Sequence, residues 1–406
     1  MKFDTFFSIS QTPADGVHPT EAQMFRNFFQ EVEAADRLGF GTAWIAEAHL
    51  SSEVQKSNKS PVIPHWKGEV GINTDIFGLA REVFARTKNI EVGSAISNIL
   101  TMGGPIAMAE RAANFAMFHG LNPDEKRRLH LGIASGRFEY MNRCFGIVPR
   151  TPVEEAAWPA LKGLIFWEAA EILARLLNGE ILSSDDVRKT ILSRANFRSD
   201  EDWQKVQQAA DTTDETITID NRYHFEQLKI IPAEYRRELI QLVAGTHDKA
   251  VQIGINQHAP CRVFNLSITQ PEIIDATHTR MKEAYHPSGG AWKRAYMPRT
   301  TFVFINDDPA LSREQKCAAA QARATKALGA YWHALIGTVD PKKVQNAAEN
   351  ALVGDPLTVA EQAKARFHPD DRLMLWFDFF DHDVERVINS MTIFMDKVAP
   401  ILRSNA

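Results

Sequence analysis

The sequence contains only three cysteines among its 406 residues. They are Cys144, Cys261 and Cys317, which lie far apart along the chain and are odd in number. This spacing excludes a disulfide framework and a clustered cysteine–zinc site. Because few cysteines without a pairing pattern are typical of proteins from a reducing compartment, we expect a cytoplasmic protein.

Long apolar runs and blocks of like charge are also missing. No apolar stretch approaches the ~20 residues that a membrane-spanning helix needs, and no basic segment followed by an apolar one opens the sequence. The net charge is −5 without a long run of one sign, which leaves no electrostatic footprint for nucleic acid or for a membrane surface. We therefore expect neither as a partner. The hydrophobic fraction of 44% is ample for a large core.

Apolar, β-prone segments alternate with helical patterns along the whole chain, and this alternation predicts a parallel sheet. Eight strands are expected, at residues 2–9, 42–47, 90–96, 128–134, 239–244, 261–266, 300–305 and 372–377. Eight units favour an α/β fold with one (β/α)8 TIM barrel spanning residues 1–406. A doubly wound open sheet is the alternative, although no G-x-G-x-x-G follows the first strand. Residues 183–222 are polar and interrupt the alternation, so we interpret them as an insertion within the barrel.

The segment from Gly39 to His49 is the most informative part of the sequence. It predicts the end of a helix, a tight turn and a buried strand that ends in Glu47 and His49. Barrel enzymes place their chemistry at the C-terminal ends of the strands. An imidazole titrates near neutral pH, so His49 is the best candidate for proton transfer, unless it is only hydrogen-bonded within the barrel mouth. Glu47 is a second catalytic candidate, or it ties the strand end to its neighbours.

Four motifs, in this order, resemble those of the bacterial luciferase-like monooxygenase family, and together they cover most of the chain. They comprise residues 39–49; residues 90–95 with Pro105 and residues 109–111; residues 129–136 with 145–146; and residues 354–361 with 373–377 and 398–402. The resemblance implies a (β/α)8 barrel, usually dimeric, that binds reduced FMN or, in one branch, a deazaflavin. Many members use reduced flavin and oxygen to insert one oxygen atom into an organic substrate.

The resemblance also implies where the cofactor would bind. The family often has a bulge beneath the flavin ring at the end of the third strand, here Ala95, Ser97 and Asn98. Asn98 would then hydrogen-bond a flavin edge, or it is an ordinary turn asparagine.

The expected phosphate site follows the fifth strand, where the chain leads into a helix near Asp248. Helix N-termini bind anions through their free N–H groups, and Thr246 adds a hydroxyl; a plain turn capped by Thr246 is the alternative. Arg137, after the fourth strand, is the candidate cation, with a surface arginine as the alternative. The residues expected at this site are Ser135, Arg137, Ala244, Gly245, Thr246 and His247.

One departure from the family pattern affects the expected activity. Luciferases carry Glu-His-His at the end of the second strand, whereas this chain has Ala48 between Glu47 and His49. A light-producing reaction is therefore not expected. The deazaflavin branch usually has an aspartate just before the matched histidine, so Ala48 argues mildly against a deazaflavin too.

We accordingly expect an FMN-dependent monooxygenase that acts on a small organic substrate. The reduced FMN would come from a separate flavin reductase, because no second nucleotide-binding motif is present. A deazaflavin-dependent oxidoreductase and a non-catalytic flavin-binding paralogue are the alternatives. No metal is expected, since helix capping and solvation explain Asp378, Asp381 and Asp383 beside His382. A homodimer is expected, because the helices at residues 75–86 and from 105 carry apolar residues on more than one side.

Overall fold

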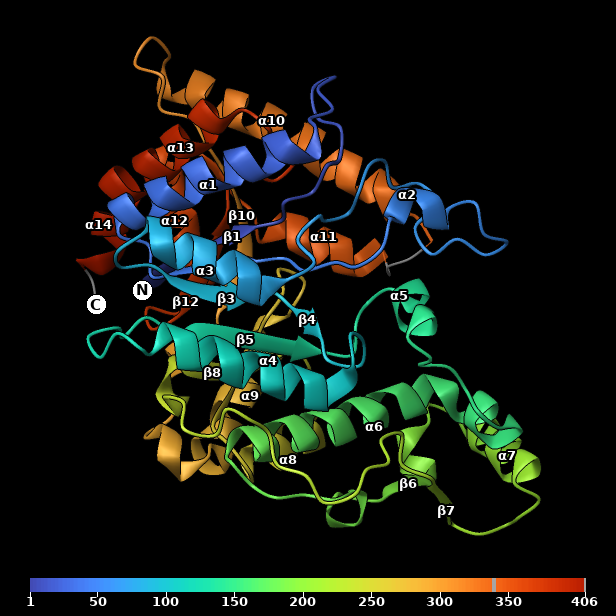
Figure 1. Ribbon diagram of the computed structural model, residues 1–406. Coiled ribbons are helices and arrows are strands. Elements are labelled where there is room, and N and C mark those ends of the chain that lie inside the picture. Colours follow the sequence, from blue (N-terminus) through green and yellow to red (C-terminus); the bar gives the residue numbers. More distant parts are fainter. Residues whose placement is uncertain (338–340, 405–406) are drawn as a thin grey trace.

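A parallel sheet of ten strands forms the centre of the computed structural model, which describes residues 1–337 and 341–404 (Figure 1). Eight of these strands follow one another around a barrel. They are β1 (Lys2–Phe7), β2 (Thr42–Ile45), β3 (Glu91–Ser94), β5 (Leu129–Ala134), β8 (Ile240–Ala244), β9 (Cys261–Val263), β10 (Arg299–Ile305) and β12 (Arg372–Trp376). Each overlaps one of the segments that the sequence predicts as a strand.

The sheet closes on itself, which distinguishes it from the open alternative. β12 pairs with both β1 and β10. On the far side of β10, a parallel bridge joins Asn265, just beyond β9, to Arg299. Two backbone hydrogen bonds hold this seam, from the N–H of Asn265 to the carbonyl of Pro298 (2.9 Å) and from the N–H of Thr300 to the carbonyl of Asn265 (3.1 Å). The predicted (β/α)8 fold is therefore confirmed.

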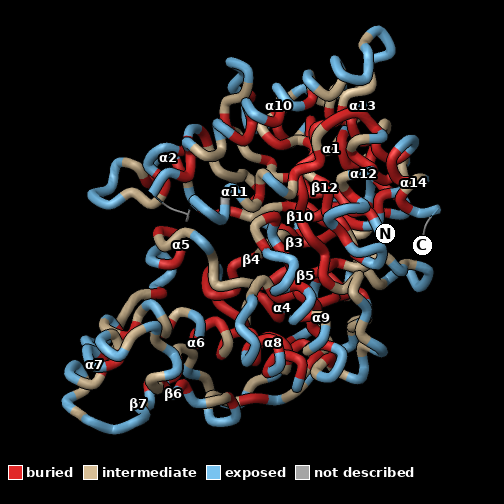
Figure 2. Tube along the Cα trace, turned by 180° about the vertical axis from the view of Figure 1, so that it is seen from behind, coloured by how far each residue is buried: buried red, intermediate tan, exposed pale blue. Residues whose placement is uncertain are grey.

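Helices cover the outside of the barrel and bury its outward-facing side chains (Figure 2). They include α1 (Glu21–Leu38), α3 (Ile76–Arg86), α4 (Gly104–His119), α6 (Pro152–Leu177), α8 (Lys249–Asn256), α9 (Pro271–Ala284), α10 (Arg313–Ala334), α12 (Pro356–Arg366) and α13 (Val384–Ile393). Helix α1 shows why the sequence predicts them. Thr20 caps it by accepting from the N–H of Gln23, and Gly39 ends it at a φ of 80°; this left-handed conformation favours glycine.

Smaller elements complete the fold. Helices α2 (Ser52–Gln55), α5 (Glu139–Cys144), α7 (Asp200–Ala209), α11 (Pro341–Glu349) and α14 (Ala399–Arg403) are short, and strands β4 (Ser97–Asn98) and β11 (Leu352–Gly354) extend the main sheet. The stretch expected as an insertion contains α7 and a separate antiparallel sheet of β6 (Thr190–Ser193) and β7 (Thr216–Ile219). Figure 1 shows them beside α6. The division of the chain into domains stays a prediction.

All eight barrel strands run parallel, so their C-terminal ends meet at one face, on the right of Figure 1. We call this face the barrel mouth. Residues 50–72 run over it, and they are fixed by hydrogen bonds. The Glu69 carboxylate accepts from the hydroxyls of Ser51 (2.5 Å) and Ser52 (2.9 Å). Over the described residues, we find no helix with the length and apolar character that crossing a membrane requires.

Candidate functional site

The barrel interior below the mouth is filled with large side chains. Phe6, Trp44, Phe264 and Met374 are buried there in one cluster. The Trp44 indole N–H donates to Asp4 Oδ2 at 2.8 Å, which satisfies the polar atom of the largest of these side chains. The interior is therefore a packed core, as is usual for this fold, and a ligand can only bind above it.

Half-buried apolar side chains lie on top of this core and form the floor of the mouth. They are Ala46, Ala95, Ile96 and Trp376, each packed against the buried cluster and each partly open to solvent. A flat apolar surface with polar groups at its edge is the usual form of a small-molecule site. Among the residues that the sequence predicts for the cofactor, Ala95 thus lies on the floor itself.

The floor depends on an interruption of the sheet after Ser94. The chain leaves β3 at Ser94 and pairs again at β4, and the hydroxyls of Ser94 and Ser97 are hydrogen-bonded at 2.7 Å. Gly132 in β5 and Gly245 just after β8 make room for this bulge. A Cβ at Gly132 would overlap the Ser94 carbonyl, and one at Gly245 would overlap the side chain of Ile96. The predicted bulge at the end of the third strand is therefore present.

Asn98 is buried and bonded within the protein. Its side-chain amide donates to Asn142 Oδ1 at 2.6 Å, and its oxygen accepts from the N–H of Leu100 at 3.1 Å. Asn142 in turn donates to the carbonyl of Ser135 at 3.0 Å. This network joins the ends of β4 and β5 to α5. Sequence reasoning missed Asn142, because it lies 44 residues from Asn98 and no motif marks it.

The helix after β8 is capped by Asp248, not by Thr246, which the sequence offers as the cap in the alternative. Thr246 Oγ1 accepts from the N–H of Asp248 at 3.1 Å, and Asp248 caps α8 by accepting from the N–H of Val251 at 3.1 Å. The Asp248 carboxylate already offsets the positive end of α8. An anion would therefore be held here by hydroxyl and cationic groups more than by the helix.

His247 lies exposed in the same turn, with Nε2 3.4 Å from Thr269 Oγ1. Desolvation lowers the pKa of His247, and the positive charge of Arg280 lowers it further. At neutral pH His247 is thus a neutral hydrogen-bonding group.

The predicted cofactor residues come from neighbouring strand ends. β4 and β8 both pair with β5, and the N–H of Gly245 donates to the carbonyl of Ile133 at 2.8 Å. Ser135 and Arg137 therefore follow a strand that lies beside the one carrying Ala244. Arg137 is exposed, with its guanidinium 5.6 Å from the centre of the Phe138 ring, which leaves it accessible to an anion.

Glu47 and His49 lie together on the side of the strand end that faces α3. Glu47 Oε2 accepts from the N–H of Ile76 at the start of α3 (3.1 Å), and Oε1 lies 3.3 Å from His49 Nε2. Only 5% of the Glu47 side chain and 7% of the His49 side chain are exposed. Glu47 thus ties the strand end to a helix, which is the structural alternative that the sequence offers for this residue. Its carboxylate also positions the His49 imidazole. Ala48 points away from them and packs against Tyr140 and Met141.

The carboxylates after β12 have partners within the protein. Asp381 binds Arg323 at 2.9 Å and Arg386 at 2.5 Å. Asp383 caps α13 by accepting from the N–H of Arg386, and His382 Nε2 donates to the carbonyl of Thr12 at 2.7 Å. Ion pairs rather than the expected solvation therefore explain Asp381, which is buried, whereas Asp383 caps a helix as the sequence predicts.

Two carboxyls in this region, Asp378 and Glu31, have raised pKa values that the sequence does not predict. Burial raises the pKa of Asp378 to about 7, with a further increase from the charge of Asp381. Burial also raises the pKa of Glu31 on α1, and the negative charges of Asp378 and Asp381 raise it further. At least one of these groups therefore keeps its proton at neutral pH. No motif could reveal this pair, because more than three hundred residues separate its members in the sequence.

Comparison with known proteins gives one family match. Residues 1–369 match the family model described as luciferase-like monooxygenase. No curated protein matches the sequence at a significant level.

Several solved structures share the fold. Monooxygenase RslO1 from Streptomyces bottropensis is 16% identical, with a TM-score of 0.65 over 98% of this chain and 99% of that one. The oxygenating constituent of 3,6-diketocamphane monooxygenase from Pseudomonas putida, solved in complex with FMN, is 14% identical, with a TM-score of 0.54 and 98% of each chain covered. An F420-dependent secondary alcohol dehydrogenase is 12% identical, with a TM-score of 0.54 and 99% of each chain covered.

Proposed function

Because this chain belongs to the luciferase-like monooxygenase family, we propose that it uses reduced FMN and molecular oxygen to oxygenate a small organic substrate. The observation that carries this proposal is the apolar floor of the barrel mouth, where Ala46, Ala95, Ile96 and Trp376 are partly open above a packed core. A flat aromatic ring system fits such a floor, and polar strand ends border it on the β4, β5 and β8 side.

The residues present fit an FMN cofactor. Ala95 and Ile96 would contact the ring, and Ser97 and Asn98 stand at its edge. Ser135, Arg137, Gly245, Thr246 and His247 would hold the phosphate, with Arg137 supplying the positive charge. The 3,6-diketocamphane enzyme, which has this fold, was solved with FMN. A flavin supplies the redox chemistry when bound, and the protein supplies binding, orientation and exclusion of water.

His49 is the proposed proton-transfer group. Its Nε2 lies 3.3 Å from Glu47 Oε1, so the carboxylate can stabilise a proton on the ring. Glu47 is itself fixed by the N–H of Ile76, which gives the imidazole a defined orientation. Glu47 thus acts through His49.

A deazaflavin is the competing cofactor, because an F420-dependent dehydrogenase shares the fold. Ala48 favours FMN, since it stands where the deazaflavin branch usually has an aspartate. We further propose that a separate reductase supplies the reduced FMN. The cytoplasmic location stays a prediction.

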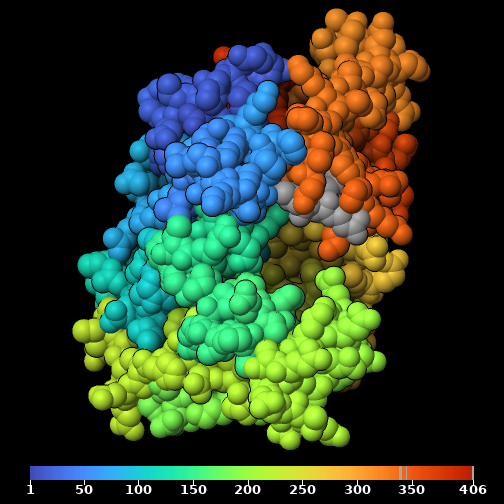
Figure 3. Space-filling model, turned by 90° about the vertical axis from the view of Figure 1, so that its right-hand side faces the viewer, coloured from blue at the N-terminus to red at the C-terminus, as the bar shows by residue number. Residues whose placement is uncertain are grey.

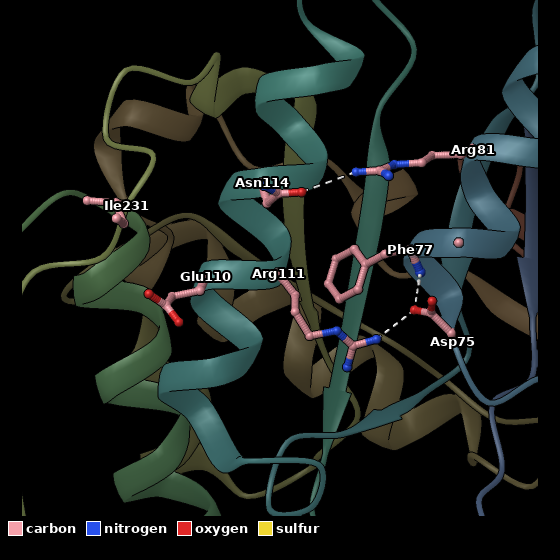
Figure 4. Close-up of a pocket in the computed structure, with 8 residues that line it drawn as sticks. Asp75, Phe77, Arg81, Glu110, Arg111, Asn114 and Ile231 are labelled. Carbon is pink, nitrogen blue, oxygen red and sulfur yellow. Dashed lines mark hydrogen bonds and ion pairs between the residues drawn. The ribbon is translucent and has the colours of Figure 1, made fainter.

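We also propose that the protein is a homodimer that associates through α3 and α4. The apolar residues on which the sequence argument rests do not support it, because they are buried within the monomer, Phe77 and Phe115 among them. Other residues on this surface do. Figure 4 shows a groove between the two helices, with Arg81 bonded to Asn114 and Ile231 at its edge. Ile231 is 72% exposed and Phe118 is 55% exposed, and such apolar side chains favour burial against a partner.

Oxygen uptake tests the function. The protein would be mixed with FMN and an unrelated flavin reductase, or with reduced F420, and given a panel of organic compounds. Catalase would return half of the oxygen that is lost to released peroxide, so an oxygen uptake that catalase leaves unchanged comes from coupled oxygenation. We expect substrate-dependent uptake with FMN. Uptake or hydride transfer only with F420 would favour the deazaflavin alternative, and FMN binding without turnover on any compound would favour the non-catalytic paralogue.

A further inference from the structure

A row of aromatic rings leads from the loop over the mouth down into the barrel. Trp66, in the loop, lies 6.2 Å from Phe380 between ring centres. Phe380 lies 4.9 Å from Phe379, and Phe379 lies 4.8 Å from Trp376. Trp376 then lies 4.4 Å from Phe6 inside the barrel. The mouth is thus bordered on one side by aromatic faces that reach its apolar floor.

Helix α5 continues this border on the other side of the loop. Tyr140 packs with Ala48 and Met141, and Trp66 packs with Ile63. The two clusters share the same half-buried side chains, those of Val62, Val70 and Phe138. They therefore form one continuous surface, which we call the mouth wall.

The mouth wall holds two buried hydrogen-bond donors that lack a partner among the described residues. The indole N–H of Trp66 donates to no described atom, and the hydroxyl of Tyr140 neither donates nor accepts; both residues are buried, with 6% of each exposed. Burial raises the pKa of Tyr140 well above its ordinary value, so its hydroxyl keeps its proton. An unpaired buried donor is unfavourable, and one that persists in a wall of a binding site has its partner on the ligand.

Formal charges near the mouth wall are already neutralised or solvated. Glu69 is held by two serines, and Glu139 on α5 binds Lys162 at 2.6 Å. The residues of the wall itself are apolar or aromatic. Figure 3 shows the barrel mouth from outside. A hollow lies between the green segment around α5 and the orange segment around α10, and yellow residues are visible deeper inside it.

We propose that the mouth wall binds the organic substrate, and that this substrate is an uncharged aromatic compound whose carbonyl oxygen accepts hydrogen bonds from Trp66 and Tyr140. Phe380 and Trp376, the half-buried members of the aromatic row, offer π faces for its rings, and the two donors fix its orientation. The described residues of the wall carry no charge, and Arg137, which stacks on Phe138 of the wall, is assigned to the FMN phosphate. This inference rests on the proposed oxygenase function in one respect: the bound compound is a substrate only if the protein is an oxygenase.

Three probes of similar shape test the wall by calorimetric titration: 2-acetylnaphthalene, 2-ethylnaphthalene and 2-naphthoate. The first carries a carbonyl acceptor, the second has none, and the third is an anion. We expect the ketone to bind at least about tenfold more tightly than the hydrocarbon, because each of the two hydrogen bonds commonly contributes several-fold up to about tenfold. Naphthoate should bind more weakly than the ketone. Tightest binding of naphthoate, equal binding of ketone and hydrocarbon, or no binding of any probe would overturn the proposal.

Variants then identify the donors. Tyr140→Phe and Trp66→Phe should each weaken ketone binding several-fold up to about tenfold and leave 2-ethylnaphthalene unchanged. Tyr235→Phe is the matched control, because that hydroxyl donates to the carbonyl of Leu177 at the end of α6; neither probe should sense it. Unchanged ketone affinity in both donor variants would contradict the assignment.

The probe titrations need neither FMN nor oxygen, so the two proposals fail separately. If the probes bind without selectivity while FMN-dependent turnover is normal, only the proposal that the mouth wall binds the substrate is wrong. If the probes bind with the expected selectivity but the protein binds no FMN, only the proposal of an FMN-dependent oxygenase is wrong.

Discussion

At the residue scale, His49 carries the proposed proton transfer. Replacing it with alanine should lower product formation by ~10²–10⁴-fold, the usual contribution of a general acid or base. FMN affinity should change little, because the expected ring and phosphate contacts come from other strands. Product yield, oxygen uptake and FMN binding should be measured together, since uncoupled peroxide release would hide the effect. Wild-type product yield in His49→Ala would remove the residue from the mechanism and strengthen the non-catalytic alternative.

Arg137 gives a second prediction at this scale. The Arg137→Glu change should weaken FMN binding at least about tenfold, because a charge-assisted hydrogen bond to the phosphate is lost and a repulsive charge takes its place. Riboflavin lacks the phosphate, so its affinity should stay within about twofold of wild type. Arg143→Glu, another exposed arginine nearby on α5, is the matched control. Equal losses for FMN and riboflavin would place Arg137 away from the phosphate.

The sequence predicts where single functional residues lie along the fold, but it does not predict which residues they contact. It places Glu47 and His49 at a strand end, where the structure has them, because strand periodicity and the position of the turn are local signals. It could not choose between a catalytic and a structural Glu47, since the answer depends on the N–H of Ile76 across the fold. Asn142 and Tyr140 were missed for the same reason. Their importance comes from contacts with residues far away in the chain.

At the scale of elements, the bulge after β3 depends on glycine in the neighbouring strand. Gly132→Ala should destabilise the protein by several kcal/mol, because the new methyl group would overlap the Ser94 backbone carbonyl, which cannot move aside cheaply. Gly163→Ala is the matched control on α6. A Cβ there meets nothing within 4 Å, so this change should be neutral or stabilise by up to about 1 kcal/mol. Urea unfolding midpoints of the two variants would decide, and similar midpoints would contradict the account of the bulge.

Asp36 links the end of α1 to the start of β3. Its carboxylate accepts from the N–H groups of Lys88 (3.0 Å), Asn89 (2.8 Å) and Ile90 (2.8 Å). Burial by itself raises the pKa of Asp36, but these three bonds outweigh it and lower the pKa below its ordinary value of 3.8.

A depressed pKa means that the ionised form is favoured by folding, so the stabilisation is fully present above the unfolded pKa and is lost as the pH falls below it. Asp36→Asn should therefore cost about 1.5–3 kcal/mol at pH 7. This difference from wild type should shrink as the pH drops below about 4. Asp214→Asn, at an exposed site, should cost almost nothing. Unfolding midpoints from pH 7 to pH 3 test this, and a difference that stays constant with pH would contradict it.

The order of the elements is predictable because each strand and helix carries its own periodicity. All eight barrel strands were anticipated, with ends that differ by a few residues. β4 and β11 were missed, because strands of two or three residues are too short to show a period. The residues that pair between β9 and β10, Asn265 with Arg299, were beyond the sequence, since local periodicity does not show which residues pair across a sheet.

At the scale of the whole molecule, the α3–α4 surface is predicted to hold two copies together. Phe118→Lys combined with Ile231→Lys should weaken dimerisation at least about 30-fold, as burying two charges in an interface opposes association. Leu357→Lys is the control, because Leu357 on α12 is also exposed (51%) but lies on another helix. Sedimentation equilibrium across micromolar concentrations measures both. A monomeric wild-type protein, or a double variant that still dimerises normally, would contradict this interface.

The central claim is that a flavin binds at the barrel mouth on the floor formed by Ala95 and its neighbours. The most direct test is a crystal structure of the protein soaked with FMN. The account predicts the ring over Ala95 and Ile96, and the phosphate within hydrogen-bond distance of Thr246 or Arg137. FMN bound elsewhere, or a ring over the floor with its phosphate far from both β5 and β8, would contradict it.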